Sequence, residues 1–237
     1  MNDHIVKSYE HELSALDGKI GQMGGLAEQL LGEAFDSLES HNPARAEATV
    51  ASDATIDLLH RELEEQAIIM IARRQPMAND LRQVISVLKV AAELERIGDL
   101  AKNIAKRAQT ISGENHPKGL LTGLRHMVEI ASRQMKDVLD AFAARDAERA
   151  LAVWRHDEQL DAVYNSVFRE LLTYMMEDPR NISLCTHLLF VAKNVERIGD
   201  HTTNIAEFVT FMARGALPEG ERPKSDLTSS TMVSKPA

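Results

Sequence analysis

A chain of 237 residues is long enough to bury a hydrophobic core without disulfide or metal staples. Its formal net charge of −9, with no run of clustered Lys or Arg, excludes a nucleic-acid-binding surface and makes cations and basic protein surfaces the expected partners. Aromatic residues make up only 4% of the chain and no Val/Thr/Tyr-rich alternating segment is present, so the composition predicts an all-α fold.

The lone cysteine, Cys185, excludes an intramolecular disulfide framework and a cysteine-based zinc site, and it favours a reducing compartment. The N-terminal residues MNDHIVKSYEHEL lack the apolar stretch of a signal peptide, and apolar runs such as AIIMIA are far too short to span a bilayer. We therefore expect a cytoplasmic protein that reaches a membrane only through its partners.

The first three predicted helices cover residues near 4–40, 43–74 and 77–110, where apolar residues recur with a helical period between turn signals. Asn42 is the expected N-cap of the second helix. Four glycines between positions 18 and 25 each cost about 1 kcal/mol relative to alanine in a helix interior, so we expect a kink or local break in the first helix.

A short linker, residues 112–118, precedes three more predicted helices near 119–144, 146–176 and 181–213. Asp146 is the expected N-cap of the middle one. Residues 215–237 are rich in Pro, Ser, Thr and Lys and poor in apolar residues, so this tail is predicted to be disordered.

The sequence word E-R-I-G-D occurs twice, starting at Glu95 and at Glu196, and the flanking residues match at the same offset of 101 positions. The chain therefore contains an internal duplication. It predicts six long helices in two tandem three-helix bundles related by a pseudo-twofold axis, the first over residues 1–111 and the second over residues 119–214.

Each copy carries two acidic pairs whose carboxylates are one helical turn apart. On a helical wheel, Glu95 and Asp99 lie away from the apolar stripe of their helix, so we expect them to face solvent or a shallow groove. Carboxylates one turn apart on adjacent helices can bind hard metal ions through oxygen. The alternative is a solvated acidic face, partly neutralised by Arg96 or Arg197. The candidate metal ligands are Glu95, Asp99, Glu196, Asp200, Asp53, Asp57, Asp157 and Asp161.

Gly98 and Gly199 lie inside two of the predicted helices, where they are expected to allow a neighbouring helix to approach closely. His201 is expected to be a surface residue rather than a metal ligand. The sequence contains no H-E-x-x-H, G-x-S-x-G or glycine-rich nucleotide-binding motif, so it does not predict an enzyme.

The segments QPMANDLRQVISVLKVAAELERIGDLAKNIAKR and EDPRNISLCTHLLFVAKNVERIGDHTTNIAEFV resemble the two halves of the PhoU family, and the resemblance extends over residues 1 to about 214. It implies a cytoplasmic protein of six helices, often a homodimer, with metal clusters bound on its surface by the acidic pairs named above. The expected metal is Fe, Mn, Mg, Zn or Ca, with no organic cofactor. Supporting positions are Asn103, Asn204, Asp80, Arg82, Arg96 and Arg197. The second copy has Asn181 in place of Asp80, so the two sites need not be equivalent.

The function that this resemblance implies is negative regulation of the phosphate-starvation response and modulation of phosphate uptake. The protein is expected to act as an adaptor between PstB, the ATP-binding subunit of the phosphate ABC transporter, and the sensor kinase PhoR. The alternatives are a surface-carboxylate, metal-dependent phosphohydrolase and a metal-binding or storage protein. The acidic pairs lack the E-x-x-H partner of di-iron carboxylate bundles, which favours the adaptor.

Overall fold

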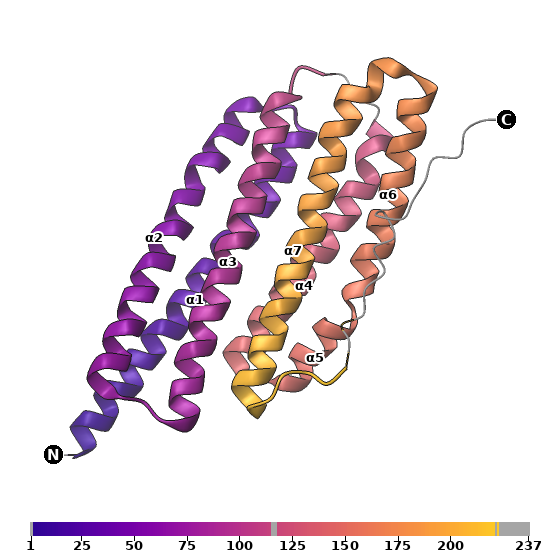
Figure 1. The fold of residues 1–237 in the computed structure, drawn as a ribbon. Coiled ribbons are helices and arrows are strands. Elements are labelled where there is room, and N and C mark those ends of the chain that lie inside the picture. Colours follow the sequence, from indigo (N-terminus) through magenta and orange to yellow (C-terminus); the bar gives the residue numbers. More distant parts are fainter. Residues whose placement is uncertain (1, 115–117, 221, 223–237) are drawn as a thin grey trace.

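The computed structural model describes residues 2–114, 118–220 and 222 (Figure 1). Every regular element within these residues is helical, which confirms the predicted all-α fold. The α-helices are α1 (Asn2–Glu39), α2 (Pro43–Arg74), α3 (Ala78–Thr110), α4 (Thr122–Ala144), α5 (Ala147–Arg155), α6 (Asp157–Glu177) and α7 (Ile182–Arg214). Two short 3₁₀ helices, η1 (Lys118–Leu121) and η2 (Pro179–Asn181), precede α4 and α7.

Helices α1, α2 and α3 form the first bundle, and α4, α5, α6 and α7 form the second (Figure 1). The bundles meet along their length, because α3 packs against α7 and α1 packs against α4. This is the predicted arrangement of two tandem bundles. Of the predicted linker between them, residues 115–117 lie outside the described residues.

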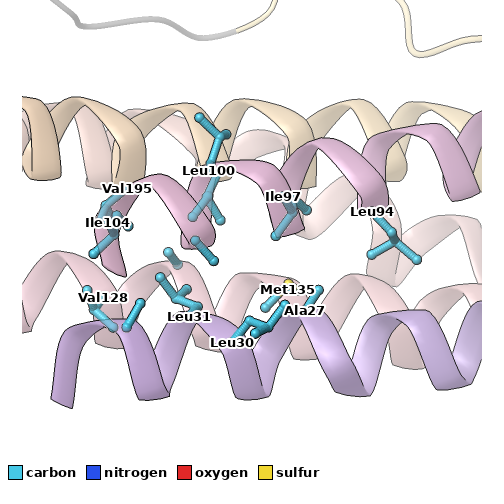
Figure 2. Close-up of a cluster of buried hydrophobic side chains, with 14 of the residues drawn as sticks. Ala27, Leu30, Leu31, Leu94, Ile97, Leu100, Ile104, Val128, Met135 and Val195 are labelled. Carbon is cyan, nitrogen blue, oxygen red and sulfur yellow. The ribbon is translucent and has the colours of Figure 1, made fainter. Parts of the chain in front are cut away.

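One hydrophobic core runs through both bundles. Figure 2 shows part of it, where Leu31 of α1, Ile97 and Ile104 of α3, Met135 of α4 and Val195 of α7 contribute fully buried side chains. The isoleucine of the first E-R-I-G-D word is therefore a core residue. Because both halves contribute to one core, the duplicated bundles support each other.

The predicted N-caps of α2 and α5 are confirmed. Asn42 Oδ1 accepts a hydrogen bond from the backbone N–H of Arg45 at 3.0 Å. Asp146 Oδ1 accepts from the backbone N–H groups of Glu148 and Arg149 at 2.9 and 3.1 Å. Each cap satisfies donors that the first turn of a helix leaves without a partner.

The local break expected in α1 is absent, because the helix continues through its glycines. At Gly24 a Cβ atom would lie 2.6 Å from Leu139 Cδ1 of α4, so this glycine allows α1 to pack closely against α4. Packing along a 38-residue helix outweighs the local cost of about 1 kcal/mol for each glycine.

The prediction of one helix over residues 146–176 is also wrong, because the chain breaks at His156 between α5 and α6. His156 Nδ1 lies 2.5 Å from the carbonyl oxygen of Ala152, and Gln134 of α4 donates to the carbonyl oxygen of His156 at 3.2 Å. Side chains that enter the backbone hydrogen-bond ladder in this way interrupt a helix. The break places Asp157 in the first turn of α6.

Candidate cation sites

The first acidic cluster joins α2 to α3. It consists of Asp53, Asp57, Glu95 and Asp99, together with Lys102, whose Nζ lies 2.5 Å from Asp53 Oδ2 and 2.5 Å from Asp99 Oδ1. The Asp53 side chain is only 4% exposed, and within the described residues its Oδ1 has no hydrogen-bond partner. Burial acts to lower the pKa of Lys102, but the hydrogen bonds and charges of Asp53 and Asp99 outweigh it and raise the pKa. Lys102 therefore stays charged between the two carboxylates.

Glu95 and Asp57 lie beside this bridged pair and line an open pocket of about 340 Å³ with His60. Burial raises the pKa of Glu95, and the neighbouring charges of Asp99 and Asp57 raise it further, against the opposing effect of Arg96 and His60. Glu95 is thus a carboxyl group whose charged form is disfavoured by its surroundings.

The raised pKa of Glu95 predicts the direction in which stability depends on pH. The folded protein holds this proton more tightly than the unfolded chain, so the contribution of Glu95 to stability is fully present below the ordinary glutamate pKa of about 4.3. It is lost as the pH rises through the raised value. We expect Glu95→Gln, which cannot ionise, to unfold at a higher urea concentration than the wild type at pH 7, with a smaller difference at pH 4.

Urea denaturation between pH 4 and pH 7 checks this expectation. Glu65→Gln is the control, because Glu65 is an exposed glutamate on α2 outside the cluster. A stability difference between Glu95→Gln and the wild type that does not change with pH would contradict the prediction.

The second acidic cluster lies on α6 and α7. Asp157 and Asp161 are on α6, and Glu196 and Asp200 are on α7. Arg222, from the segment after α7, contacts Asp157 and Asp200, and Lys193 Nζ lies 2.9 Å from Glu196 Oε2. Arg222 Nε donates to Asp157 Oδ2 at 2.7 Å, and Nη2 donates to Asp157 Oδ1 at 2.9 Å and to Asp200 Oδ1 at 2.7 Å. A guanidinium group therefore bridges α6 and α7 as the Lys102 ammonium group bridges α2 and α3.

Arg222 lies within the segment predicted to be a disordered tail, residues 215–237. Its side chain is 16% exposed and contacts α6 and α7. Residues 221 and 223–237 lie outside the described residues.

Glu95 and Asp99, expected to face solvent or a shallow groove, are partly exposed, but four of the other six carboxylates are buried. A helical wheel gives only the angle from the apolar stripe of one helix, whereas here a neighbouring helix covers the acidic side. Both clusters consequently lie between helices. Asp53, Asp157, Asp161 and Glu196 are buried, and Asp57, Glu95, Asp99 and Asp200 are partly buried.

The two mid-helix glycines explain how the helices come so close at the clusters. A Cβ atom on Gly98 would lie 3.0 Å from both Asp53 Oδ1 and Ile56 Cδ1 of α2. A Cβ atom on Gly199 would collide with Leu160 Cδ2 of α6. The prediction that these glycines allow close helix approach is confirmed.

The supporting positions on α3 and α7 are divided between the clusters and the open surface. Asn204 Oδ1 accepts from Arg222 Nη1 at 3.3 Å, so Asn204 belongs to the second cluster. Arg96 lies 3.6 Å from Glu95 but is 64% exposed. Asn103 and Arg197 are exposed.

The structure does not bring Asp80 and Arg82 to either cluster. Both lie in the first turns of α3, about 20 Å along the helix axis from Glu95. Near the start of α3, burial raises the pKa of Tyr9 and the charge of Asp80 raises it further. The Arg82 guanidinium lies 5.8 Å from the centre of the Phe211 ring.

Sequence reasoning missed the cations that bridge the clusters. Lys102 follows Asp99 by three residues, a spacing that pairs opposite charges on a helix, so the sequence did hold a signal for it. The sequence holds no comparable signal for the position of Arg222. His201, predicted to be a surface residue, lies between the bundles, where its Nδ1 is 2.6 Å from Glu93 Oε2 of α3.

The carboxylates of both clusters offer oxygen ligands, which hard metal ions prefer. Within the described residues, Asp53 Oδ1 accepts no hydrogen bond. In the part of the chain that the structure describes, however, no three His, Cys, Asp or Glu side chains converge in a group that could hold a metal ion. Oxygen donors suit a hard cation, but in the described structure Lys102, Lys193 and Arg222 form ion pairs with the carboxylates of the two clusters.

Comparison with protein families finds the duplication again. A family model described as the PhoU domain matches residues 20–108 and then residues 124–209. The chain belongs to the PhoU family. The two matched segments correspond to the two bundles and include all eight carboxylates, whereas Arg222 lies beyond the second PhoU match.

PhoU-family relatives align with nearly the whole chain. The phosphate-specific transport system accessory protein PhoU homolog of Rhizobium meliloti (strain 1021) is 51% identical over 226 residues, which cover 95% of each chain. The homolog of the same name in Caulobacter vibrioides (strain NA1000 / CB15N) is 47% identical over 229 residues, 97% of this chain and 100% of the relative.

Solved PhoU structures confirm the fold. The crystal structure of PhoU from Pseudomonas aeruginosa superposes with a TM-score of 0.84 at 38% identity, covering 88% of this chain and 100% of that chain. The phosphate transport system regulatory protein PhoU from Streptococcus pneumoniae gives a TM-score of 0.81 at 26% identity, covering 89% of this chain and 99% of that chain. Among the described helices, none combines the length and apolar character needed to cross a bilayer.

Proposed function

We propose that this PhoU-family chain is a regulatory accessory protein of phosphate transport that represses the phosphate-starvation response. The observation that carries the proposal is the PhoU match in both halves, together with relatives named as phosphate-specific transport system accessory proteins over nearly their whole length. Such agreement over two duplicated bundles supports a shared role more strongly than a single short motif does.

The proposed mode of action is that of an adaptor without chemistry of its own. It couples PstB, the ATP-binding subunit of the phosphate ABC transporter, to the sensor kinase PhoR on the cytoplasmic side of the membrane, as a homodimer. Exposed apolar side chains on α2 support a role in protein contacts, since Leu58, Ile68 and Ile69 are 50%, 63% and 44% exposed.

Metal binding at the two acidic clusters is part of the proposal. The ligands proposed for the first cluster are Asp53, Asp57, Glu95 and Asp99. Those proposed for the second are Asp157, Asp161, Glu196 and Asp200. A bound Fe, Mn, Mg, Zn or Ca ion supplies positive charge that holds two helices together, and oxygen ligands are compatible with each of these metals.

A phosphate-regulated reporter gene tests the function in cells. We expect deletion of the protein to derepress the reporter in phosphate-rich medium, and the wild-type chain to restore repression. An unchanged reporter in the deletion strain, in both rich and starved medium, would overturn the proposed function.

The same assay tests whether the two clusters are needed for repression. Asp99→Asn combined with Asp200→Asn removes one charge from each cluster with little change of shape, and it is expected to derepress the reporter. The matched control is Glu65→Gln combined with Glu170→Gln, which removes the same charge from exposed positions on α2 and α6. Full repression by the cluster variant would show that regulation does not require the clusters, while the proposed regulatory function would stand.

A further inference from the structure

The seam where α3 packs against α7 joins the two bundles, and the duplication relates its two ends. At the first end, Lys89 Nζ of α3 lies 4.9 Å from the centre of the Phe208 ring of α7. At the second end, the guanidinium carbon of Arg107 of α3 lies 4.3 Å from the centre of the Phe190 ring of α7. At the offset of 101 residues, Lys89 corresponds to Phe190 and Arg107 to Phe208. Both ends therefore use the same pair of positions, with the cation and the ring exchanged.

The first end of the seam contains a carboxylate that the chain itself supplies. The Glu93 side chain of α3 is 18% exposed, and its Oε2 accepts a hydrogen bond from Asn204 Nδ2 of α7 at 3.1 Å. The same oxygen lies 2.6 Å from His201 Nδ1. Polar side chains of α7 are thus arranged around an anion of α3.

The second end of the seam has a pocket where the first end has this carboxylate. The residue equivalent to Glu93 is Asn194, and the residue equivalent to Asn204 is Asn103. Both asparagines line an open pocket of about 360 Å³, whose other lining residues are Lys106, Arg107, Thr110 and Phe190. Among the described residues, no carboxylate lines this pocket, although the net charge of the chain is −9.

The two cations of the pocket keep their full charge. Within residues 2–114, 118–220 and 222, neither Lys106 nor Arg107 forms an ion pair with an Asp or Glu side chain. Arg107 Nη1 lies 3.2 Å from His187 Nδ1, and because arginine can only donate, His187 accepts as a neutral imidazole. Burial lowers the pKa of His187, and the charge of Arg107 lowers it further. His187 therefore orients the guanidinium group without cancelling its charge.

The lining side chains have the chemistry of an oxyanion site. The planar donors of Arg107 match the oxygens of a phosphoryl group, and Lys106 adds a second positive charge. The amides of Asn103 and Asn194 offer further N–H donors. A phosphoryl group carries a charge of about −1.5 to −2 at pH 7, so it matches two cations better than a carboxylate does.

We propose that this pocket binds a phosphoryl oxyanion, which lies between α3 and α7 as the Glu93 carboxylate does at the first end of the seam. The phosphoryl group is that of inorganic phosphate or of a small organic phosphate whose apolar part contacts the half-exposed ring of Phe190. Because the lining residues come from α3 and α7, the bound anion joins the two bundles. This inference is independent of metal binding at the acidic clusters.

Isothermal titration calorimetry of the full chain with inorganic phosphate and with adenosine monophosphate (AMP) tests the pocket. Arg107→Gln is expected to weaken binding at least about tenfold, because it removes charge-assisted hydrogen bonds to the ligand. The matched control is Arg169→Gln, which removes the same charge from an exposed position on α6 and is expected to bind as the wild type does. Equal affinity of these two variants overturns the proposal, and so does the absence of binding of both ligands to the wild type at millimolar concentrations.

Adenosine, titrated in the same way, separates the two sources of the phosphoryl group. Tighter binding of AMP than of inorganic phosphate assigns an organic phosphate to the pocket, and binding of AMP no tighter than that of phosphate assigns inorganic phosphate. Adenosine is expected not to bind. Binding of adenosine as tightly as AMP overturns recognition of the phosphoryl group.

A second variant separates loss of binding from loss of folding. Asn194→Glu places a carboxylate at the position equivalent to Glu93, so it is expected to abolish binding of both ligands and to unfold at a urea concentration no lower than the wild type. The control is Asn79→Glu, which adds the same charge at an exposed position in the first turn of α3. Equal binding by the two variants overturns the placement of the ligand. None of these results bears on the reporter assay in the deletion strain, so failure of this inference is distinct from failure of the proposed function.

Discussion

Replacing Lys102 with methionine is expected to lower the free energy of unfolding by about 3 kcal/mol, because it leaves a buried carboxylate without its cation. Asp53 is 4% exposed, and its second oxygen has no hydrogen-bond partner in the described structure. The partly exposed Asp99 loses the same ammonium group and then adds repulsion between the two carboxylates. The methionine retains most of the apolar stem, so the effect reports the charge.

Urea denaturation at pH 7 measures this loss. Lys106→Met, one turn further along α3 and exposed, is the control for loss of a lysine charge. The double variant Asp53→Asn, Lys102→Met is expected to recover much of the lost stability, since a neutral amide is far cheaper to bury than an unpaired carboxylate. A Lys102→Met variant as stable as Lys106→Met would show that the bridge contributes little.

Replacing Ile97 with alanine is expected to cost about 3 kcal/mol, within the range measured for truncation of fully buried aliphatic side chains. Ile97 is 0% exposed and lies in the core that both bundles share (Figure 2). The residues around it come from long helices packed on several sides, which limits how far the site can collapse around the lost atoms.

The adjacent residue of the same motif provides the control. Arg96 is 64% exposed, and Arg96→Ala is expected to change the stability by no more than about 0.5 kcal/mol. Thermal and urea denaturation of both variants compare them directly. Similar losses for Ile97→Ala and Arg96→Ala would contradict the assignment of Ile97 to the core and Arg96 to the surface.

The residues of the E-R-I-G-D motif have different physical roles. Ile97 fills the core, Gly98 lets α2 approach, and Glu95 and Asp99 line the acidic cluster. Two of these residues, Ile97 and Gly98, serve helix packing, and the other two line the acidic cluster. The repeated word is therefore a packing motif as well as an acidic one.

The helices could be predicted because their signals are local. Apolar periodicity and the caps at Asn42 and Asp146 depend on residues within a few turns of each other. The break at His156 could not be predicted in this way, since it depends on Gln134, a residue of another helix. The packing of α1 against α2, α3 and α4 likewise involves residues far away in the sequence.

The candidate sites were only partly predictable for the same reason. Repeated spacing of Asp and Glu identified the eight carboxylates and which pairs belong together. The burial of these carboxylates depends on how α2 covers α3 and how α6 covers α7. A helical wheel describes one helix only and cannot predict this. Arg222 comes from a segment with no helical period and no match to the first half, so its position follows from tertiary contacts alone.

The break between α5 and α6 gives the second half an electrostatic property that the first half lacks. Asp157 sits in the first turn of α6, where the free backbone N–H groups of a helix carry partial positive charge and stabilise an anion by about 0.3 to 1 kcal/mol. Asp53 lies in the middle of α2 and has no such support. A single interruption of the backbone thus gives one of two duplicated aspartates a stabilising helix-terminus environment that the other lacks.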